Sequence, residues 1–379
     1  MSRDATRATI RVAHCVHGLG LGGAQKVIAS LVRGTDPAAF RHVVYSCDDG
    51  IHRDEIEAAG AVVRIIPRRF PKLDPTWVLT LARAMRADRI DVVHAHLFGD
   101  SLHGYLASRA AGRPPVVLTL HIGVEGCTGL QRHGYGWLLA RCARAVACSA
   151  AVARSFEPLI AAGRTMQVIA NGIETTPATV PPPAAREALR RSLGAAPDDV
   201  VFAVIGRLAE QKGHRYLLTA FAALVREHGV GARLVVLGEG ELRPSLERQA
   251  AEVGIADRVL FAGLRSDVPA LLPGIDAVVF SSLFEGLPVA LLEAMAAGRC
   301  IVATAVPGIV EAVRDQREAV IVPIGDVDGL AAGMLRAVRT PGLAQRLGDA
   351  ARARFLAEFT AERMVARYAA VYEDVLPPG

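Results

Sequence analysis

Short apolar runs that alternate with amphipathic segments are the feature that most constrains this chain. In the first half the runs occur at residues 9–19, 41–47, 61–67, 90–97, 115–123, 144–150 and 166–172. Helical periodicity lies between some of them, for example over 22–34 and 74–87. Strands that alternate with helices predict an α/β fold, in which a parallel sheet carries helices on both faces.

The same pattern restarts after a proline-rich segment. Further apolar runs occur at 200–208, 232–240, 259–263, 275–282, 300–306 and 318–323, followed by a long helical region. A chain of 379 residues is long for one core. We predict two doubly wound, Rossmann-like domains, at 1–175 and 199–359, that face each other across a cleft. Residues 176–198 form a stiff linker, and a C-terminal helix at 360–379 returns to the first domain.

Composition excludes several classes of protein. The N-terminus has no long apolar core of a signal peptide, and no stretch approaches the roughly 20 apolar residues of a membrane span. The six cysteines are scattered, which indicates reduced thiols in a cytoplasmic protein. The net charge is +7 for residues 1–180 and −2 for 181–379. With 5% aromatic residues, a nucleic-acid partner is not expected.

The turn after the first strand contains a glycine-rich loop. Gly18, Gly20 and Gly23 spell G-x-G-x-x-G, and Asp48 and Asp49 close the second strand. This is the layout of a dinucleotide-binding fingerprint, although the motif is short and can be a simple strand-to-helix turn. Both a dinucleotide and a phosphate site need a close backbone approach to an anion at a helix N-terminus.

Two basic residues follow the first strand of the second domain. Arg207 and Lys212 lie in the loop before a helix, at the carboxyl end of the strand, where ligands of doubly wound sheets bind. A guanidinium fork and an ammonium group suit a diphosphate. Two exposed basic residues at a turn are the alternative for this pair taken alone.

The segment EGLPVALLEAMAAG, residues 285–298, places two carboxylates around an apolar helix. Pro288 suits the first helical position and Gly298 the position after the helix, so free N–H groups near Val289 form an anion site. We predict that Glu285, in the preceding turn, binds sugar hydroxyls. Glu293, inside the helix, is predicted to bind a ribose, because an unused buried carboxylate is costly.

Two patterns resemble metal sites, and we interpret neither as one. Asp326 and Asp328 spell D-x-D, but they precede a helical segment, so an N-cap and a first-turn acid explain them. His94 and His96 were assigned to opposite faces of a strand, one in the core and one at the cleft, so that they would not share a metal. We therefore expect no metal and no cofactor.

The chain resembles the retaining glycosyltransferases of family 4, which have the two-domain GT-B fold. The resemblance rests on the 285–298 segment and on ordered matches over nearly the whole chain: G-G-A at 22–24, D-V-V-H-A-H at 91–96, T-L-H at 119–121, N-G-I at 171–173, G-R-L and Q-K-G within 206–213, and G-E-G at 238–240. One departure is Gln25, where the family often has Glu.

The resemblance implies a role for each matching residue. Arg207 and Lys212 would bind the diphosphate of a nucleotide-sugar donor, and Glu293 its ribose. Glu285 would hold sugar hydroxyls and act with His121, the match to the active-site histidine, which we expect to orient a hydroxyl. The remaining donor-binding positions would act through their backbone: Gly22, Gly23, Gly263, Leu287, Pro288 and Val289.

The implied reaction is transfer of a hexose, with retention of configuration, from a nucleotide-diphosphate sugar, with UDP favoured. The acceptor would be lipid-linked, a polysaccharide or another glycan. Glycosylation of a soluble natural product is the alternative. An NAD-dependent oxidoreductase, or a non-catalytic protein that binds sugar nucleotides, explains fewer of the residues.

A basic cluster on the first domain suggests peripheral contact with an anionic membrane. Arg68, Arg69 and Lys72 form one group, and Arg132, Arg141 and Arg144 a second. We expect nearby Tyr135, Trp137, Leu138 and Leu139 to supply apolar contacts to the interface.

Overall fold

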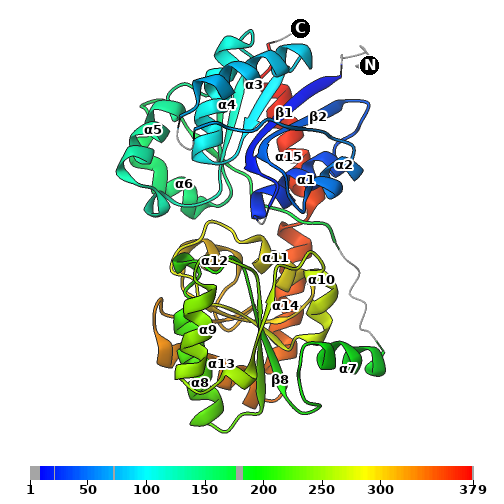
Figure 1. The fold of residues 1–379 in the computed structure, drawn as a ribbon, viewed down its shortest axis with the longest axis vertical. Coiled ribbons are helices and arrows are strands. Elements are labelled where there is room, and N and C mark those ends of the chain that lie inside the picture. The colour runs from blue at the N-terminus through cyan, green and yellow to red at the C-terminus, as the bar shows by residue number, and fades with distance from the viewer. Residues whose placement is uncertain (1–8, 21, 71–72, 176–181, 378–379) are drawn as a thin grey trace. The chain divides into compact units, whose positions relative to one another are not determined.

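The computed structural model describes residues 9–20, 22–70, 73–175 and 182–377. The chain divides into two compact units. The first unit combines Met1–Glu174 with Ala361–Gly379, and the second unit is Thr175–Thr360. Figure 1 traces both units along the chain.

The first unit is built on a parallel sheet with the order β3-β2-β1-β4-β5-β6-β7 in the part of the chain that the structure describes. Each predicted apolar run of this half contains one strand, so this part of the prediction is confirmed. Because the order reverses between β1 and β4, the carboxyl ends of these two strands flank a topological switch point. The strands are β1 (Ile10–Gly18), β2 (Phe40–Asp48), β3 (Val62–Ile65), β4 (Val92–Ala95), β5 (Val116–Leu120), β6 (Arg144–Ala147) and β7 (Met166–Val168).

The helices of the first unit begin at conventional caps. Asp74 accepts hydrogen bonds from the backbone of Thr76 and Trp77, and Pro75 opens the helix that follows. Thr128 and Gln131 form a capping box. The helices are α1 (Gly23–Gly34), α2 (Arg53–Ala58), α3 (Pro75–Ala87), α4 (Phe98–Ala110), α5 (Gly129–Leu139), α6 (Ala150–Phe156) and α15 (Ala361–Asp374).

The C-terminal helix α15 belongs to the first unit and packs beside α1. In Figure 1 it runs behind β1 in red. The backbone N–H of Ala361 donates to the carbonyl of Ile173 at 2.8 Å. Tyr368 and Tyr372 are fully buried against the sheet, where each hydroxyl has a hydrogen-bonding partner.

The second unit holds another parallel sheet, whose described strands follow the order β10-β9-β8-β11-β12-β13. Every run predicted for this half again contains a strand. The order reverses between β8 and β11, which defines a second switch point. The strands are β8 (Val200–Ile205), β9 (Ala232–Leu237), β10 (Val259–Gly263), β11 (Ala277–Phe280), β12 (Cys300–Thr304) and β13 (Val320–Val322).

Helices cover this second sheet and bury an apolar core that includes Phe202, Phe221 and Leu347. They are α8 (His214–Arg226), α9 (Arg243–Glu252), α10 (Val268–Leu271), α11 (Val289–Ala296), α12 (Pro307–Ala312), α13 (Val327–Arg339) and α14 (Leu343–Glu358). No helix within the described residues combines the length and the apolar character needed to cross a membrane.

The proline-rich segment differs from the stiff linker that we predicted. Residues 176–181 lie outside the described part of the chain, but Pro183–Ser192 form helix α7. Arg186 and Arg190 on α7 bind the two carboxylate oxygens of Asp276, at 2.6 Å and 2.8 Å. The prediction was wrong here because proline is tolerated in the first turn of a helix, where its missing N–H costs nothing.

Candidate active site

Lys212 and Glu285 form a short ion pair at the carboxyl edge of the second sheet. The distance from Lys212 Nζ to Glu285 Oε1 is 2.5 Å, and the side chains are 19% and 7% exposed. Lys212 ends a short 3₁₀ turn (Glu210–Lys212) after β8, whereas Glu285 lies in the loop after β11. The switch point between these strands therefore brings the two predicted site residues together.

Backbone conformation sets the position of Lys212. Gly213, the next residue, has φ +61°, and a Cβ there would lie 2.1 Å from the carbonyl oxygen of Ser281. Only glycine fits this close approach. The Ser281 hydroxyl in turn donates to the carbonyl of Lys212 at 2.9 Å. The two loops are thus fixed against each other on either side of the ion pair.

Glu285 has two further partners that sequence reasoning did not assign. Ser282 Oγ donates to Oε1 at 2.7 Å, and Gln211 Nε2 donates to Oε2 at 3.2 Å and to the carbonyl of Phe284 at 3.0 Å. A carboxylate has about four lone-pair positions, so Glu285 keeps the capacity to accept another hydrogen bond. Gln211 belongs to the quoted Q-K-G motif, but a lone serine such as Ser282 gives no usable pattern.

Helix α11 starts beside this pair. Val289 is its first residue and Pro288 is the N-cap, one position earlier in the helix than we predicted for the proline. Gly298 has φ +62° just after the helix, which confirms the predicted end. A Cβ on Gly308 would lie 1.5 Å from the carbonyl oxygen of Gly286, so the start of α12 contacts the loop before α11 directly. The loop that carries Leu287 is thereby held in place.

Glu293 lies inside α11 and is 6% exposed. Its buried position agrees with the expectation that a carboxylate in this apolar helix requires polar partners, and it has one in the structure. Its binding to a ribose stays a prediction.

Two more predicted positions lie on the same sheet edge. Arg207 follows β8 directly and is exposed, with no ion-pair partner for its guanidinium among the described residues. Gly263 ends β10 with φ +70°, and its carbonyl accepts the N–H of Gly238 at 2.8 Å. The parallel strands thus place Arg207, Lys212, Glu285 and Gly263 on one edge of one sheet.

The glycine-rich loop of the first unit closes tightly onto the start of α1. The Gln25 amide donates to the carbonyl of Gly18 at 2.6 Å, and a Cβ on Gly22 would lie 2.3 Å from Gln25 Oε1. Gly23 is the first residue of α1. Gly22 and Gly23 therefore lie at a helix N-terminus, as predicted, and their contact with a phosphate stays a prediction.

His121 follows β5 at the carboxyl edge of the first sheet and is partly buried. Its Nε2 lies 3.1 Å from Nδ1 of His96. Burial disfavours the charged imidazolium and lowers the pKa of His121 to about 4, so the ring is neutral near pH 7. A neutral ring at this position can donate from one nitrogen and accept at the other.

Our prediction for His94 and His96 was wrong. Residues two apart on a strand point to the same face, and the two rings lie 4.1 Å apart between centroids, both buried. With His14 they form a group whose ligand atoms lie within 4.8 Å of one another. However, both ring nitrogens of each of these three histidines have hydrogen-bonding partners within the protein.

The D-x-D sequence forms a helix cap, as predicted. Asp326 is the N-cap of α13 and accepts the N–H of Gly329 at 2.8 Å, and Asp328 lies in the first turn. The cysteines also match the prediction, since none of the six forms a disulfide.

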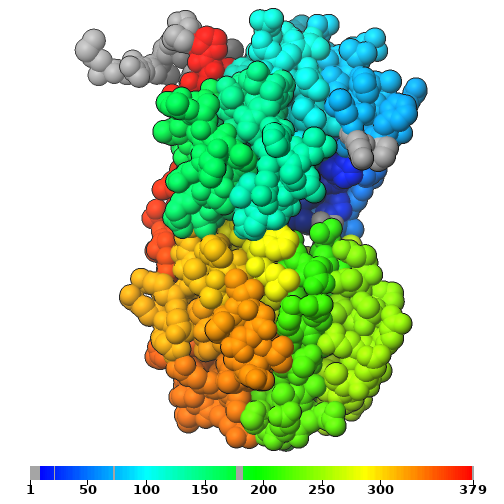
Figure 2. Space-filling model, turned by 90° about the vertical axis from the view of Figure 1, so that its left-hand side faces the viewer, coloured from blue at the N-terminus to red at the C-terminus, as the bar shows by residue number. Residues whose placement is uncertain are grey.

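The residues predicted to contact a membrane are arranged differently from our expectation. Tyr135, Leu138 and Leu139 are buried, whereas Trp137 is 38% exposed and Leu130, which we did not single out, is 80% exposed. Arg144 pairs with Asp374, and Lys72 lies outside the described residues. Figure 2 turns the face covered by α5 and α6, in green, toward the viewer.

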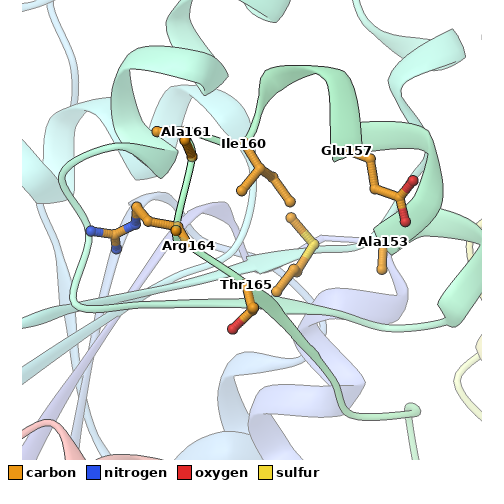
Figure 3. A pocket seen from close by; sticks show the side chains of 9 residues that line it. Ala153, Glu157, Ile160, Ala161, Arg164 and Thr165 are labelled. Carbon is orange, nitrogen blue, oxygen red and sulfur yellow. The ribbon is translucent and has the colours of Figure 1, made fainter.

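A hollow of about 440 Å³ lies at the opposite edge of the first sheet. It is formed where α6 leads into β7, at the amino end of that strand (Figure 3). Ligands of doubly wound sheets bind at the carboxyl ends, so we do not assign this hollow to the site. It is lined by Ala153, Glu157, Ile160, Ala161, Ala162, Gly163, Arg164, Thr165 and Met166.

Comparison with known proteins connects these two sheet edges to one family. A family model described as Glycosyltransferase Family 4 matches residues 21–177, and one described as Glycosyl transferases group 1 matches residues 185–354. Glycogen synthase of Mycobacterium tuberculosis is 31% identical over 323 residues, which cover 78% of this chain and 75% of that protein. The chain belongs to the family 4 glycosyltransferases.

Two further similarities extend this result. The family 4 enzyme is 26% identical to the UDP-Gal:alpha-D-GlcNAc-diphosphoundecaprenol alpha-1,3-galactosyltransferase of Escherichia coli over 272 residues, 69% of this chain and 70% of that protein. The crystal structure of Anabaena Alr3699/HepE in complex with UDP-glucose superposes with a TM-score of 0.86, covering 96% of this chain and 100% of that chain at 22% identity. The fold is GT-B, as predicted.

Proposed function

We propose that this glycosyltransferase transfers a hexose from a UDP-sugar to a lipid-linked, polysaccharide or other glycan acceptor, with retention of configuration and without a metal. The observation that carries the proposal is the ion pair of Lys212 and Glu285 at the switch point beside the start of α11. It puts a cation for a diphosphate and a carboxylate for sugar hydroxyls within one hydrogen bond of each other.

The chemistry follows from the charge of the leaving group. When the bond between the anomeric carbon and the phosphate oxygen breaks, its electron pair stays on the nucleoside diphosphate. Lys212, Arg207 and the free N–H groups at the start of α11 are the groups available to stabilise that charge. Each well-placed donor contributes about 2–4 kcal/mol by analogy with oxyanion holes. The acceptor oxygen then attacks from the face that the phosphate leaves, and the phosphate takes the acceptor proton.

The identity of the donor is supported by the relatives. The E. coli galactosyltransferase is named for UDP-Gal, and Alr3699/HepE was crystallised with UDP-glucose. We therefore favour UDP over GDP or ADP. We assign Glu293 to the ribose and Gly263 to the neighbourhood of the base, and we assign Glu285 and His121 to sugar hydroxyls.

The acceptor is proposed from two features. The E. coli relative is named for a diphosphoundecaprenol-linked substrate. On this chain, exposed Leu130 and Trp137 lie on α5 together with Arg132, and Arg141 stacks on the Trp137 ring at 4.6 Å. Apolar side chains flanked by arginines suit peripheral contact with an anionic membrane that carries such a lipid.

A donor panel tests the proposal. Binding of UDP, GDP, ADP and NADH is measured by calorimetry, and hydrolysis of UDP-glucose, UDP-galactose and UDP-N-acetylglucosamine is followed by nucleotide release. We expect UDP to bind most tightly and at least one UDP-sugar to be hydrolysed. Preference for GDP or ADP would overturn the UDP assignment, and transfer to soluble small molecules but not to glycans or lipid-linked sugars would overturn the acceptor assignment.

A further inference from the structure

Four imidazoles form a continuous hydrogen-bonded row across the first sheet. His121 Nε2 lies 3.1 Å from His96 Nδ1, and His96 Nε2 lies 3.3 Å from His14 Nδ1. His14 Nε2 lies 2.9 Å from His42 Nδ1, and His42 Nε2 lies 2.7 Å from the hydroxyl of Thr35. The row starts at the carboxyl end of β5, crosses β4 and β1, and ends on β2 beside the C-cap of α1.

The same nitrogen leads in the same direction at every step. Each ring in the row offers Nδ1 toward the Thr35 side of its predecessor and Nε2 toward the Thr35 side of itself or the next ring, so no link joins two like atoms. A neutral imidazole has one donor and one acceptor nitrogen. A row of this kind can therefore exist in only two states, in which all rings donate from Nε2 or all donate from Nδ1.

Thr35 selects between these two states. Its hydroxyl has a single proton, which it donates to the carbonyl of Val32 at 3.3 Å. The hydroxyl oxygen must then accept from His42, so His42 carries its proton on Nε2. Since the protons of a row must be consistent, the same tautomer follows for His14, His96 and His121.

The surroundings keep the row neutral. Burial lowers the pKa of His42 to about 4 and holds the pKa values of His14 and His96 well below their ordinary range, with mutual repulsion as a further cause for the last two. His94 lies beside the row but is not a member. Its two nitrogens bind the hydroxyls of Tyr372 and Thr119, each at 2.7 Å.

We propose that this row fixes His121 in the Nε2–H tautomer, so that its Nδ1 presents a lone pair that accepts a hydrogen bond from a sugar hydroxyl. Nδ1 of His121 has no hydrogen-bonding partner among the described residues, and the ring lies at the sheet edge where ligands bind. Thr35, His42, His14 and His96 are positioning residues that act through His121. The role of the hydroxyl rests on the proposed function, whereas the tautomer does not.

Nuclear magnetic resonance tests the tautomer directly. The full chain is labelled with ¹⁵N-histidine, and long-range ¹H–¹⁵N correlations at pH 7 distinguish Nε2–H from Nδ1–H rings, with His121→Gln used for assignment. We expect a single Nε2–H form of His121. An Nδ1–H, charged or averaged ring would overturn the proposal.

Variants at the far end of the row separate positioning from a structural role. Thr35→Val keeps the size of the side chain but removes the hydroxyl, and we expect a mixture of tautomers at His121. Thr35→Ser keeps the hydroxyl and should restore the single form. If Thr35→Val does not fold, His42→Phe, which removes the last imidazole, is the second variant. An unchanged His121 spectrum in the folded variant would overturn the proposal.

Kinetics then connect the tautomer to transfer. If the two tautomers become equally populated in Thr35→Val, kcat should fall about twofold or more while UDP binds with unchanged affinity. An equal loss of UDP affinity would indicate a general structural effect and contradict the positioning role. Because the spectra need no substrate, a chain that shows the expected tautomers without transferring sugar would contradict the proposed function alone.

Discussion

Lys212 and Glu285 stabilise each other at a position where either charge alone would be costly. Both are largely buried, and Ser282 and Gln211 satisfy the remaining carboxylate oxygens. Removing one member of such a pair leaves an uncompensated charge. The pair also holds the ammonium group beside the start of α11, so the same contact that stabilises the loops presents the cation for a diphosphate.

Loss of the Lys212 charge should weaken donor binding. We expect Lys212→Ala to reduce the affinity for UDP by about 1–3 kcal/mol, as is usual for a hydrogen bond to a charged group. Lys212→Gln keeps a donor for Glu285 and separates this effect from unfolding. Calorimetry with UDP measures both, and Arg215→Ala, an exposed base on α8, is the control. Wild-type affinity in both folded Lys212 variants would contradict the site assignment.

The sequence predicted some of these residues and not others for physical reasons. Strand ends on one sheet edge must lie close together, so Lys212 and Glu285 could be placed in one site from the order of the elements alone. Ser282 could not, because a serine beside a strand has no distinguishing spacing. His94 and His96 were misplaced by an error of geometry, since the side-chain period of a strand is two.

Helix α5 illustrates how element-level prediction succeeds and fails. Its existence and its cap followed from the sequence, but its orientation did not. Tyr135, Leu138 and Leu139 have the i, i+3, i+4 spacing of a core-facing stripe, and they are buried. The exposed apolar residues Leu130 and Trp137 lie outside that stripe. Strands were easier to predict, because buried parallel strands have continuous apolar sequences.

The exposed side of α5 should bind anionic vesicles. We expect Leu130→Gln and Trp137→Gln each to weaken sedimentation with phosphatidylglycerol vesicles at low salt, because full burial of such a side chain contributes about 1.5–3 kcal/mol. Leu356→Gln, at an exposed leucine of α14, should have no effect. Failure of the wild-type chain to bind these vesicles, or binding that ignores both α5 substitutions, would contradict membrane contact through this helix.

The buried histidines couple the stability of the whole first unit to pH. In the unfolded chain a histidine binds a proton near pH 6.5, whereas burial holds the pKa of His42 at about 4 in the folded unit. Between these values the unfolded chain binds more protons, so the free energy of unfolding falls as the pH is lowered. His14, His94 and His96 act in the same direction.

Urea unfolding of the first unit should therefore depend steeply on pH. Each of these buried histidines contributes a slope of up to about 1.4 kcal/mol per pH unit between roughly pH 6.5 and 4. Both tryptophans, Trp77 and Trp137, lie in the first unit, so their fluorescence reports its unfolding. His133→Gln, at an exposed histidine of α5, should leave the slope unchanged. A flat stability profile from pH 7 to 5 would show that the row is not buried and neutral.

The stereochemistry of transfer without metal tests the central claim most directly. Purified protein is incubated with a UDP-α-hexose and a glycan acceptor in excess EDTA, and proton NMR of the first product measures the anomeric coupling constant. The account predicts turnover in EDTA and an α-linked product, because Lys212, Arg207 and the α11 N-terminus stabilise the leaving diphosphate. A β-linked product, or activity that EDTA abolishes and Mg²⁺ or Mn²⁺ restores, would contradict it.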